Sequence, residues 1–154
     1  MRRSLVLLFI LALAACVEAG PRFAAVADSL PPIPAGEARI YFYRILEPYE
    51  GDVPTIAFLN GMAVGVTQAG AVLYRDVAPG TYEIKVASDT AFPNQFKTMS
   101  IAAGETLYVR VETLESWGCR GKAASACIFT TFAVSLVPSE TARQEMQDLE
   151  FLRG

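Results

Sequence analysis

Residues 37–137 alternate between short runs rich in β-branched and aromatic residues and turns that contain glycine, proline or asparagine. Short runs of this kind at regular spacing predict strands. In residues 81–86 apolar and charged positions alternate, whereas in 38–45 both alternate sets are largely apolar, as is typical of a central strand. The pattern predicts a mainly β, antiparallel sandwich. The expected strands are residues 38–45, 55–59, 62–66, 71–77, 81–86, 96–101, 106–112 and 128–137.

A tight turn and a terminal helix complete this pattern. Asn60-Gly61 lies between two apolar runs, and both residues tolerate a positive φ, so a hairpin is expected there. After Pro138, Ser139 is a candidate helix N-cap. We therefore expect a short C-terminal helix over residues 139–152, with Leu149 and Leu152 packed against the sheet.

The first fifteen residues have the pattern of an export signal. Arg2 and Arg3 precede an uncharged apolar run over residues 4–12. This run is shorter than the ~20 residues that a permanent membrane-spanning helix needs, but it matches the apolar region of a signal peptide. Residues 1–15 are therefore expected to be removed on export.

The apolar run ends in Leu13-Ala14-Ala15-Cys16, which resembles the lipobox of bacterial lipoprotein precursors. Small residues at Ala14 and Ala15 suit a narrow protease site, and the Cys16 thiol can form a thioether with a diacylglyceryl group. Two or more acyl chains give a stable membrane anchor. The alternative is an ordinary secretory signal that happens to have a cysteine near its cleavage site.

Residues 16–36 are expected to be a lipidated cysteine followed by a tether. The segment is rich in proline around residues 30–36 and has no apolar periodicity, which favours an extended, semi-stiff spacer. Val17 follows the cysteine, where aspartate would favour retention in the inner membrane of some bacteria. We therefore expect a periplasm-facing protein, in the outer membrane rather than the inner, with its folded domain over residues 37–154.

The charge of the exported chain disfavours nucleic acid as a partner. The full sequence has 13 basic and 16 acidic residues, and loss of Arg2 and Arg3 leaves 11 basic residues, a net charge of −5. An acidic domain repels phosphate backbones. With no polybasic cluster apparent, the acyl chains are expected to supply the membrane attachment.

Cys119 and Cys127 remain once Cys16 is assigned to the lipid. An even pair in an oxidising compartment predicts a disulfide, worth ~2–3 kcal/mol for a loop of this length in the chain-entropy model. The alternative is a metal or redox site. The spacing is not CxxC, and the chain has no histidine to complete a zinc set.

The same lack of histidine removes the Ser-His-Asp relay and the commonest general base. No spacing singles out a pair of carboxylates, so we expect no enzyme, no cofactor and no metal. Trp117, Arg120 and Lys122 lie around the cysteine loop and are candidate partner contacts, because Trp and Arg are typical interface anchors. The alternative is that Trp117 covers an edge of the core and the charges keep the loop soluble.

Residues 39–111 resemble a family of small bacterial lipoproteins that carry a domain of unknown function related to the PEGA-type β-sandwich. The resemblance rests mainly on turn and core patterns: Ile40-Tyr41-Phe42-Tyr43-Arg44, Leu59-Asn60-Gly61, Val64-Gly65, Val77-Ala78-Pro79-Gly80-Thr81-Tyr82 and Ala103-Gly104-Glu105-Thr106-Leu107-Tyr108-Val109. It implies an immunoglobulin-like sandwich and assigns no catalytic residue.

We therefore expect a membrane-anchored, non-catalytic binding or structural module that contacts an envelope protein. Two alternatives remain open. The domain could bind envelope glycan or another small ligand, with a tyrosine platform as one candidate surface. Alternatively, it could be a hydrolase.

Overall fold

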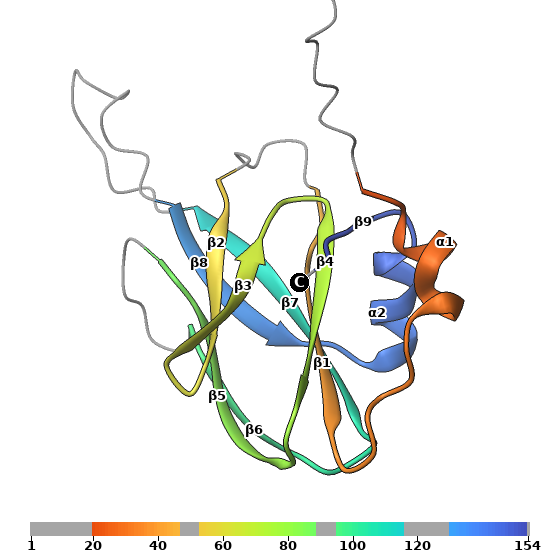
Figure 1. Ribbon diagram of the computed structural model, residues 1–154. Helices are drawn as coiled ribbons and strands as arrows, with labels where there is room; N and C mark the ends of the chain where they lie inside the picture. Colours follow the sequence, from red (N-terminus) through yellow and green to blue (C-terminus); the bar gives the residue numbers. More distant parts are fainter. Residues whose placement is uncertain (1–19, 47–52, 89–94, 116–129, 154) are drawn as a thin grey trace, which may run out of the picture.

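A computed structural model of the protein describes residues 20–46, 53–88, 95–115 and 130–153. Two sheets pack face to face (Figure 1), which confirms the mainly β sandwich. The strand order is β8-β7-β1-β4-β9 in one sheet and β3-β2-β5-β6 in the other. The strands are β1 (Ala38–Arg44), β2 (Thr55–Leu59), β3 (Met62–Thr67), β4 (Ala71–Val77), β5 (Gly80–Val86), β6 (Lys97–Ile101), β7 (Thr106–Glu115), β8 (Thr130–Leu136) and β9 (Glu150–Phe151).

Strand β1 is the centre of the five-stranded sheet and is buried along its whole length. This confirms the central strand that its two-sided apolar pattern predicts. Strand β4 pairs with β1 in the expected antiparallel direction, but β7 runs parallel to β1 on the other side, and β9 runs parallel to β4. The purely antiparallel arrangement was therefore wrong for two pairings, because alternation along a strand carries no information about the direction of its neighbour.

The hairpin at Asn60-Gly61 is confirmed. It joins β2 to β3, and both residues have positive φ, 50° and 80° respectively. The register between these strands shifts between Ala57 and Phe58. Such a bulge bends the strand locally and increases its twist.

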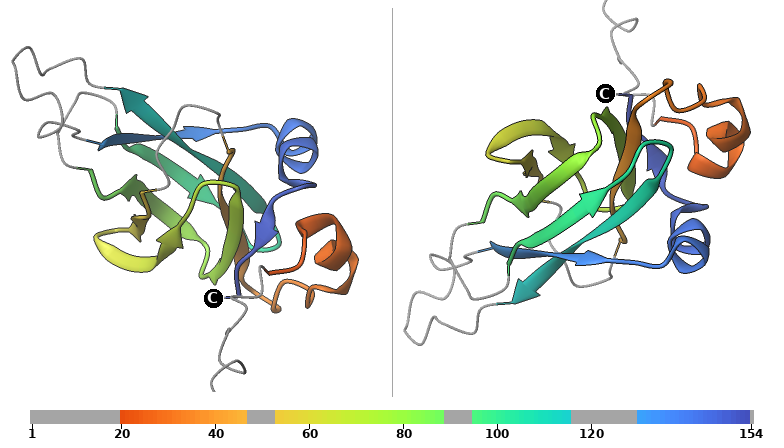
Figure 2. Two further views of the ribbon diagram at one scale, coloured as in Figure 1. Left: turned by 90° about the horizontal axis from the view of Figure 1, so that it is seen from above. Right: turned by 90° about the horizontal axis from the view of Figure 1, so that it is seen from below.

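The inner faces of the two sheets form one hydrophobic core. Phe42, Ile40 and Ile84 are fully buried there, at 0% exposure. A second cluster lies on the outer face of the five-stranded sheet, where α2 (Ser139–Met146) and α1 (Phe23–Val26) cover it. Both helices lie on this one side of the molecule (Figure 2).

The expected tether is wrong for the part of the chain from Gly20 onwards. Residues 20–33, hereafter the strap, contain α1 and the 3₁₀ turn η1 (Ala27–Ser29) and cross the outer face of the five-stranded sheet. The amide of Phe23 donates to the carbonyl of Leu149 at 2.7 Å, and the amide of Phe151 donates to the carbonyl of Pro21 at 2.8 Å. The Phe23 side chain is only 7% exposed. A lone aromatic residue in a proline-rich run gives no periodic signal, so the sequence pattern could not identify this contact.

The C-terminal helix is confirmed but is shorter than residues 139–152. It ends at Met146, and Glu150–Phe151 form strand β9 instead. Ser139 is not the N-cap: Pro138 occupies that position, and no side chain caps the helix. Leu149 and Leu152 both pack against the sheet as expected: Leu149 is buried in the outer cluster, and Leu152 packs against the inner core.

Candidate binding site

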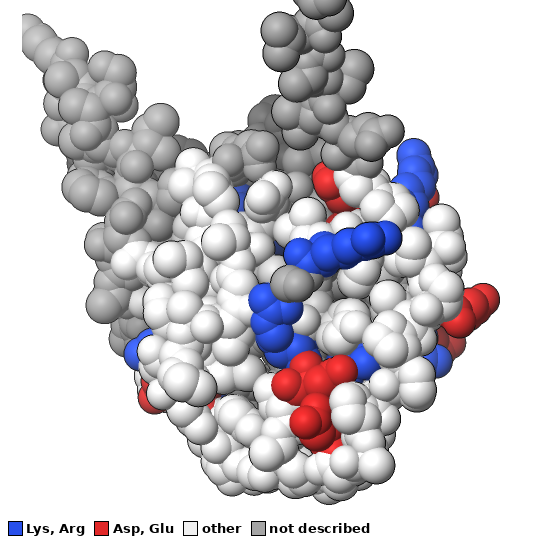
Figure 3. Space-filling model, viewed as in Figure 1, with Lys and Arg blue, Asp and Glu red and all other residues white. Residues whose placement is uncertain are grey.

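The side of the sandwich between β3 and the β4–β9 edge is open, because β3 and β9 are edge strands of different sheets. Two neighbouring cavities of about 420 and 320 Å³ lie along this side. Arg75 and Arg153 line both of them. Figure 3 shows this face, with basic side chains across its centre and an acidic group below them. We call this surface the arginine groove.

Arg39 forms an ion pair with Asp76 beside the groove and also holds the strap through Pro31. Arg39 and Asp76 lie opposite each other on β1 and β4, and the guanidinium contacts both carboxylate oxygens, at 2.6 and 2.8 Å. Arg39 also donates to the carbonyl of Pro31 at 2.9 Å, and it lies 4.0 Å from the ring centroid of Tyr74. The hydrogen bond to Asp76 is the main reason that the pKa of Arg39 is raised. The charge of Asp76 is thereby neutralised from within the protein.

Arg75 reaches the groove from a position that faces the core. It lies opposite Ile40 on β1, next to the site where Leu73 packs into the inner core. Its guanidinium donates to the carbonyl of Tyr74 at 2.9 Å. A side chain at Gly65 would come within 3.2 Å of Leu73 and 3.5 Å of the Arg75 guanidinium. The glycine in β3 therefore leaves the space through which Arg75 reaches the surface.

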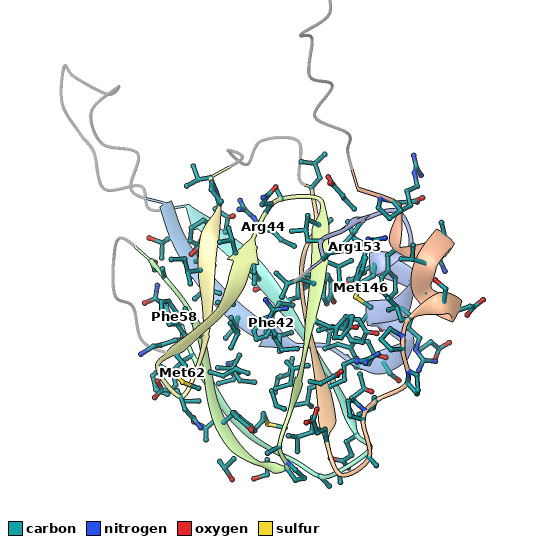
Figure 4. The ribbon with its side chains drawn as sticks, in the orientation of Figure 1. Phe42, Arg44, Phe58, Met62, Met146 and Arg153 are labelled. Carbon is teal, nitrogen blue, oxygen red and sulfur yellow. The ribbon has the colours of Figure 1, made fainter. Side chains whose placement is uncertain are left out.

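Arg153 follows β9 and is exposed; Figure 4 labels it beside β4. Among the described residues, neither Arg153 nor Arg75 forms an ion pair. Between the strap and β4, the rings of Tyr74 and Phe151 stack at 6.1 Å and line the same cavity. The groove therefore offers two guanidinium groups without ion-pair partners, next to two stacked aromatic rings. This arrangement suits an anionic ligand that has an apolar portion.

A further cavity of about 480 Å³ lies on the other side of the strap. Tyr41 and Tyr108 stack at 5.4 Å along it, and Arg143 donates to the hydroxyl of Tyr108 at 3.3 Å. Tyr43 is fully buried nearby and donates to Glu145. Burial, followed by this hydrogen bond, raises the pKa of Tyr43. These tyrosines pack under the helices and do not form an exposed platform.

A second surface is the outer face of β2 and β3. Ile56 and Val66 lie opposite each other and are 40% and 48% exposed, and Met62 is 73% exposed. Strand β3 contains no charged residue and no proline. Figure 4 places Phe58 and Met62 on this side, and Figure 3 shows an uncharged surface over the same strands. We call this surface the β2–β3 face.

The site residues expected from the sequence all lie outside the described residues, and they stay predictions. They are Leu13, Ala14, Ala15 and Cys16 of the lipobox, the pair Cys119 and Cys127, and the contact candidates Trp117, Arg120 and Lys122. The sequence pattern did not single out Arg75 or Arg153. The one signal that could have identified the site is the position of Arg75. It is a basic residue at an alternate position of its strand that otherwise holds the apolar Leu73 and Val77.

In the described ranges, no three His, Cys, Asp or Glu side chains are grouped as metal ligands would be. None of the described helices is long and apolar enough to cross a membrane.

Comparison with known families gives one match: the family described as protein of unknown function (DUF2846) matches residues 34–122. This span includes the residues that carry the resemblance noted in the sequence, so a domain of unknown function is confirmed. The strap up to residue 33, β8, α2 and β9 lie outside the matched span. Neither the curated proteins nor the solved structures give a match.

Proposed function

The chain belongs to the DUF2846 family, whose function is unknown, and we propose that it is a non-catalytic binding module held in the bacterial envelope by lipid on Cys16. The lipobox-like sequence at residues 13–16 supports the anchor. Val17 in place of aspartate favours the outer membrane, with the domain facing the periplasm. We also propose that the domain is related to the PEGA-type β-sandwich, with which its two packed sheets are compatible.

The β2–β3 face is the observation that carries the binding role. An uncharged edge strand with exposed apolar side chains lacks the charges and prolines that commonly block further strand pairing. Such surfaces mark sites of contact with other proteins. We therefore propose that an envelope protein docks here and covers Ile56, Met62 and Val66.

The anchor is tested by the intact mass of the protein purified from the membrane fraction, measured with and without reduction. We expect a chain that starts at Cys16 and carries acyl groups. If Cys119 and Cys127 form a disulfide, reduction adds the mass of two hydrogens. An uncut or unlipidated chain in the membrane fraction would contradict the anchor.

The partner surface is tested by cross-linking in cells that express Val66→Lys. A lysine placed in an apolar interface is expected to weaken partner capture roughly thirtyfold, the equivalent of ~2 kcal/mol at an interface hot spot. Thr98→Lys is the matched control, because Thr98 is exposed on β6 and pairs with Glu83 at the other side of the same sheet. Equal capture by the wild type and both variants would reject the β2–β3 face.

A small ligand or envelope glycan is the second candidate, favoured by the cavity of about 480 Å³ beside Tyr41 and Tyr108. Its volume lies in the range of small-molecule sites. Specific retention on peptidoglycan would support this candidate over a protein partner.

A further inference from the structure

The folded part of the chain begins very close to the proposed lipid. Only Val17, Glu18 and Ala19 separate Cys16 from Gly20. Four residue steps span at most ~14 Å even when fully extended. Gly20 is itself fixed to the domain, because its amide donates to a carboxylate oxygen of Glu150 at 2.5 Å. A lipid on Cys16 therefore holds this part of the sandwich at the membrane surface.

The arginine groove lies beside the first described residues of the chain. Pro21, the second described residue, lines the groove together with Arg153. The Pro21 carbonyl also accepts a hydrogen bond from the backbone amide of Phe151, whose ring lines the groove. The headgroup layer of a bilayer is roughly 5–8 Å deep on each side. The groove is therefore within reach of the headgroups when the chain is anchored.

The charges in the groove select an anion. Asp76, the acidic residue that lines it, is held by Arg39 through two hydrogen bonds. Glu150 accepts the amide of Gly20, and Asp148 pairs with Arg22 at 2.6 Å. Among the described charged residues that line the groove, Arg75 and Arg153 therefore have no ion-pair partner. Guanidinium groups bind phosphate oxygens through paired, charge-assisted hydrogen bonds.

We propose that Arg75 and Arg153 bind the phosphate of an anionic phospholipid headgroup in the membrane that holds the anchor. The stacked Tyr74 and Phe151, with Leu30 of the strap, then face the apolar part of that lipid. This inference rests on the proposed anchor at Cys16. In this proposal the groove orients the domain on the membrane, and the β2–β3 face binds the protein partner.

The test uses the lipidated full-length product, with its acyl mass verified first, in phosphatidylcholine vesicles that contain increasing fractions of phosphatidylglycerol. The readout is hydrogen exchange of the strap amides, residues 20–33. We expect exchange to slow severalfold as phosphatidylglycerol is added. Arg75→Gln and Arg153→Gln each remove one guanidinium group. Each should raise about fivefold the fraction of phosphatidylglycerol that gives half of the slowing, because ~1 kcal/mol per basic residue corresponds to that factor.

Arg22→Gln is the matched control, because Arg22 lies beside Gly20 but pairs with Asp148 and does not line the groove. It should behave as the wild type. Loss of the wild-type effect at high salt would support a charge interaction without any substitution. The proposal would be overturned if phosphatidylglycerol did not slow exchange, or if Arg22→Gln weakened the slowing as much as the groove substitutions do. It would also be overturned if inorganic phosphate slowed strap exchange fully in pure phosphatidylcholine vesicles.

The two proposals fail in distinguishable ways. A lipidated mass with no response to phosphatidylglycerol would overturn only the headgroup site. An unlipidated mass would overturn the anchor and, with it, the headgroup site that depends on it.

Discussion

Replacing Asp76 with alanine is expected to lower the free energy of unfolding by about 3 kcal/mol, as measured by urea denaturation. The Arg39 side chain is only 5% exposed, and Asp76 accepts two of its hydrogen bonds. The substitution leaves a buried guanidinium without its counter-ion, although Arg39 keeps the carbonyl of Pro31. An uncompensated buried charge is among the most destabilising changes a single residue can make.

Asp148→Ala is the matched control for this change. It also removes an arginine's aspartate partner, but the side chains of Arg22 and Asp148 are 71% and 84% exposed. Water replaces the lost partner there, so the expected change is below ~1 kcal/mol. Similar losses in the two variants would show that burial of the Arg39–Asp76 pair does not set its contribution to stability.

Replacing Phe23 with alanine is expected to cost about 3 kcal/mol and to release the strap. The Phe23 ring packs edge-on against Tyr41 at 5.7 Å and against Phe151 at 6.3 Å. Its removal leaves a cavity between the strap and the sheet. We therefore expect a lower urea midpoint and faster proteolytic cleavage within residues 20–33.

Phe96→Ala provides the comparison, because Phe96 is 51% exposed and leaves little cavity. It should be nearly neutral in the same denaturation assay. If Phe23→Ala were equally neutral and its strap were cut no faster, the segment would behave as the extended tether that its proline-rich sequence suggests.

The sequence alone predicts most of the sandwich because its strands carry their own periodic signals. Strand β1 is apolar on both alternate sets, and it is buried on both sides. Asn60-Gly61 specifies a hairpin locally, because the turn needs positive φ at two adjacent residues. The lipobox-like sequence at residues 13–16, which predicts the anchor, is likewise a local signal.

The arginine groove, by contrast, is formed by residues that only the fold brings together. Arg75 and Arg153 are far apart in the sequence, and they line the same cavities because β9 pairs with β4. Strand β9 has two residues, too few to show an alternating pattern. The parallel direction of β7 beside β1 is hidden for a related reason, since the side-chain period of a strand is the same whichever way its neighbour runs.

The strap shows the same division between local signals and distant contacts. Its prolines correctly indicate a segment without long regular structure, but they do not reveal that Phe23 is buried against Tyr41 and Phe151. The sequence thus specified strands β1–β8 and the hairpin, because each depends on neighbouring residues, and for the same reason it predicts the lipid attachment. The tertiary structure decided where the strap lies and which charges remain unpaired, because both depend on contacts between segments that only folding brings together.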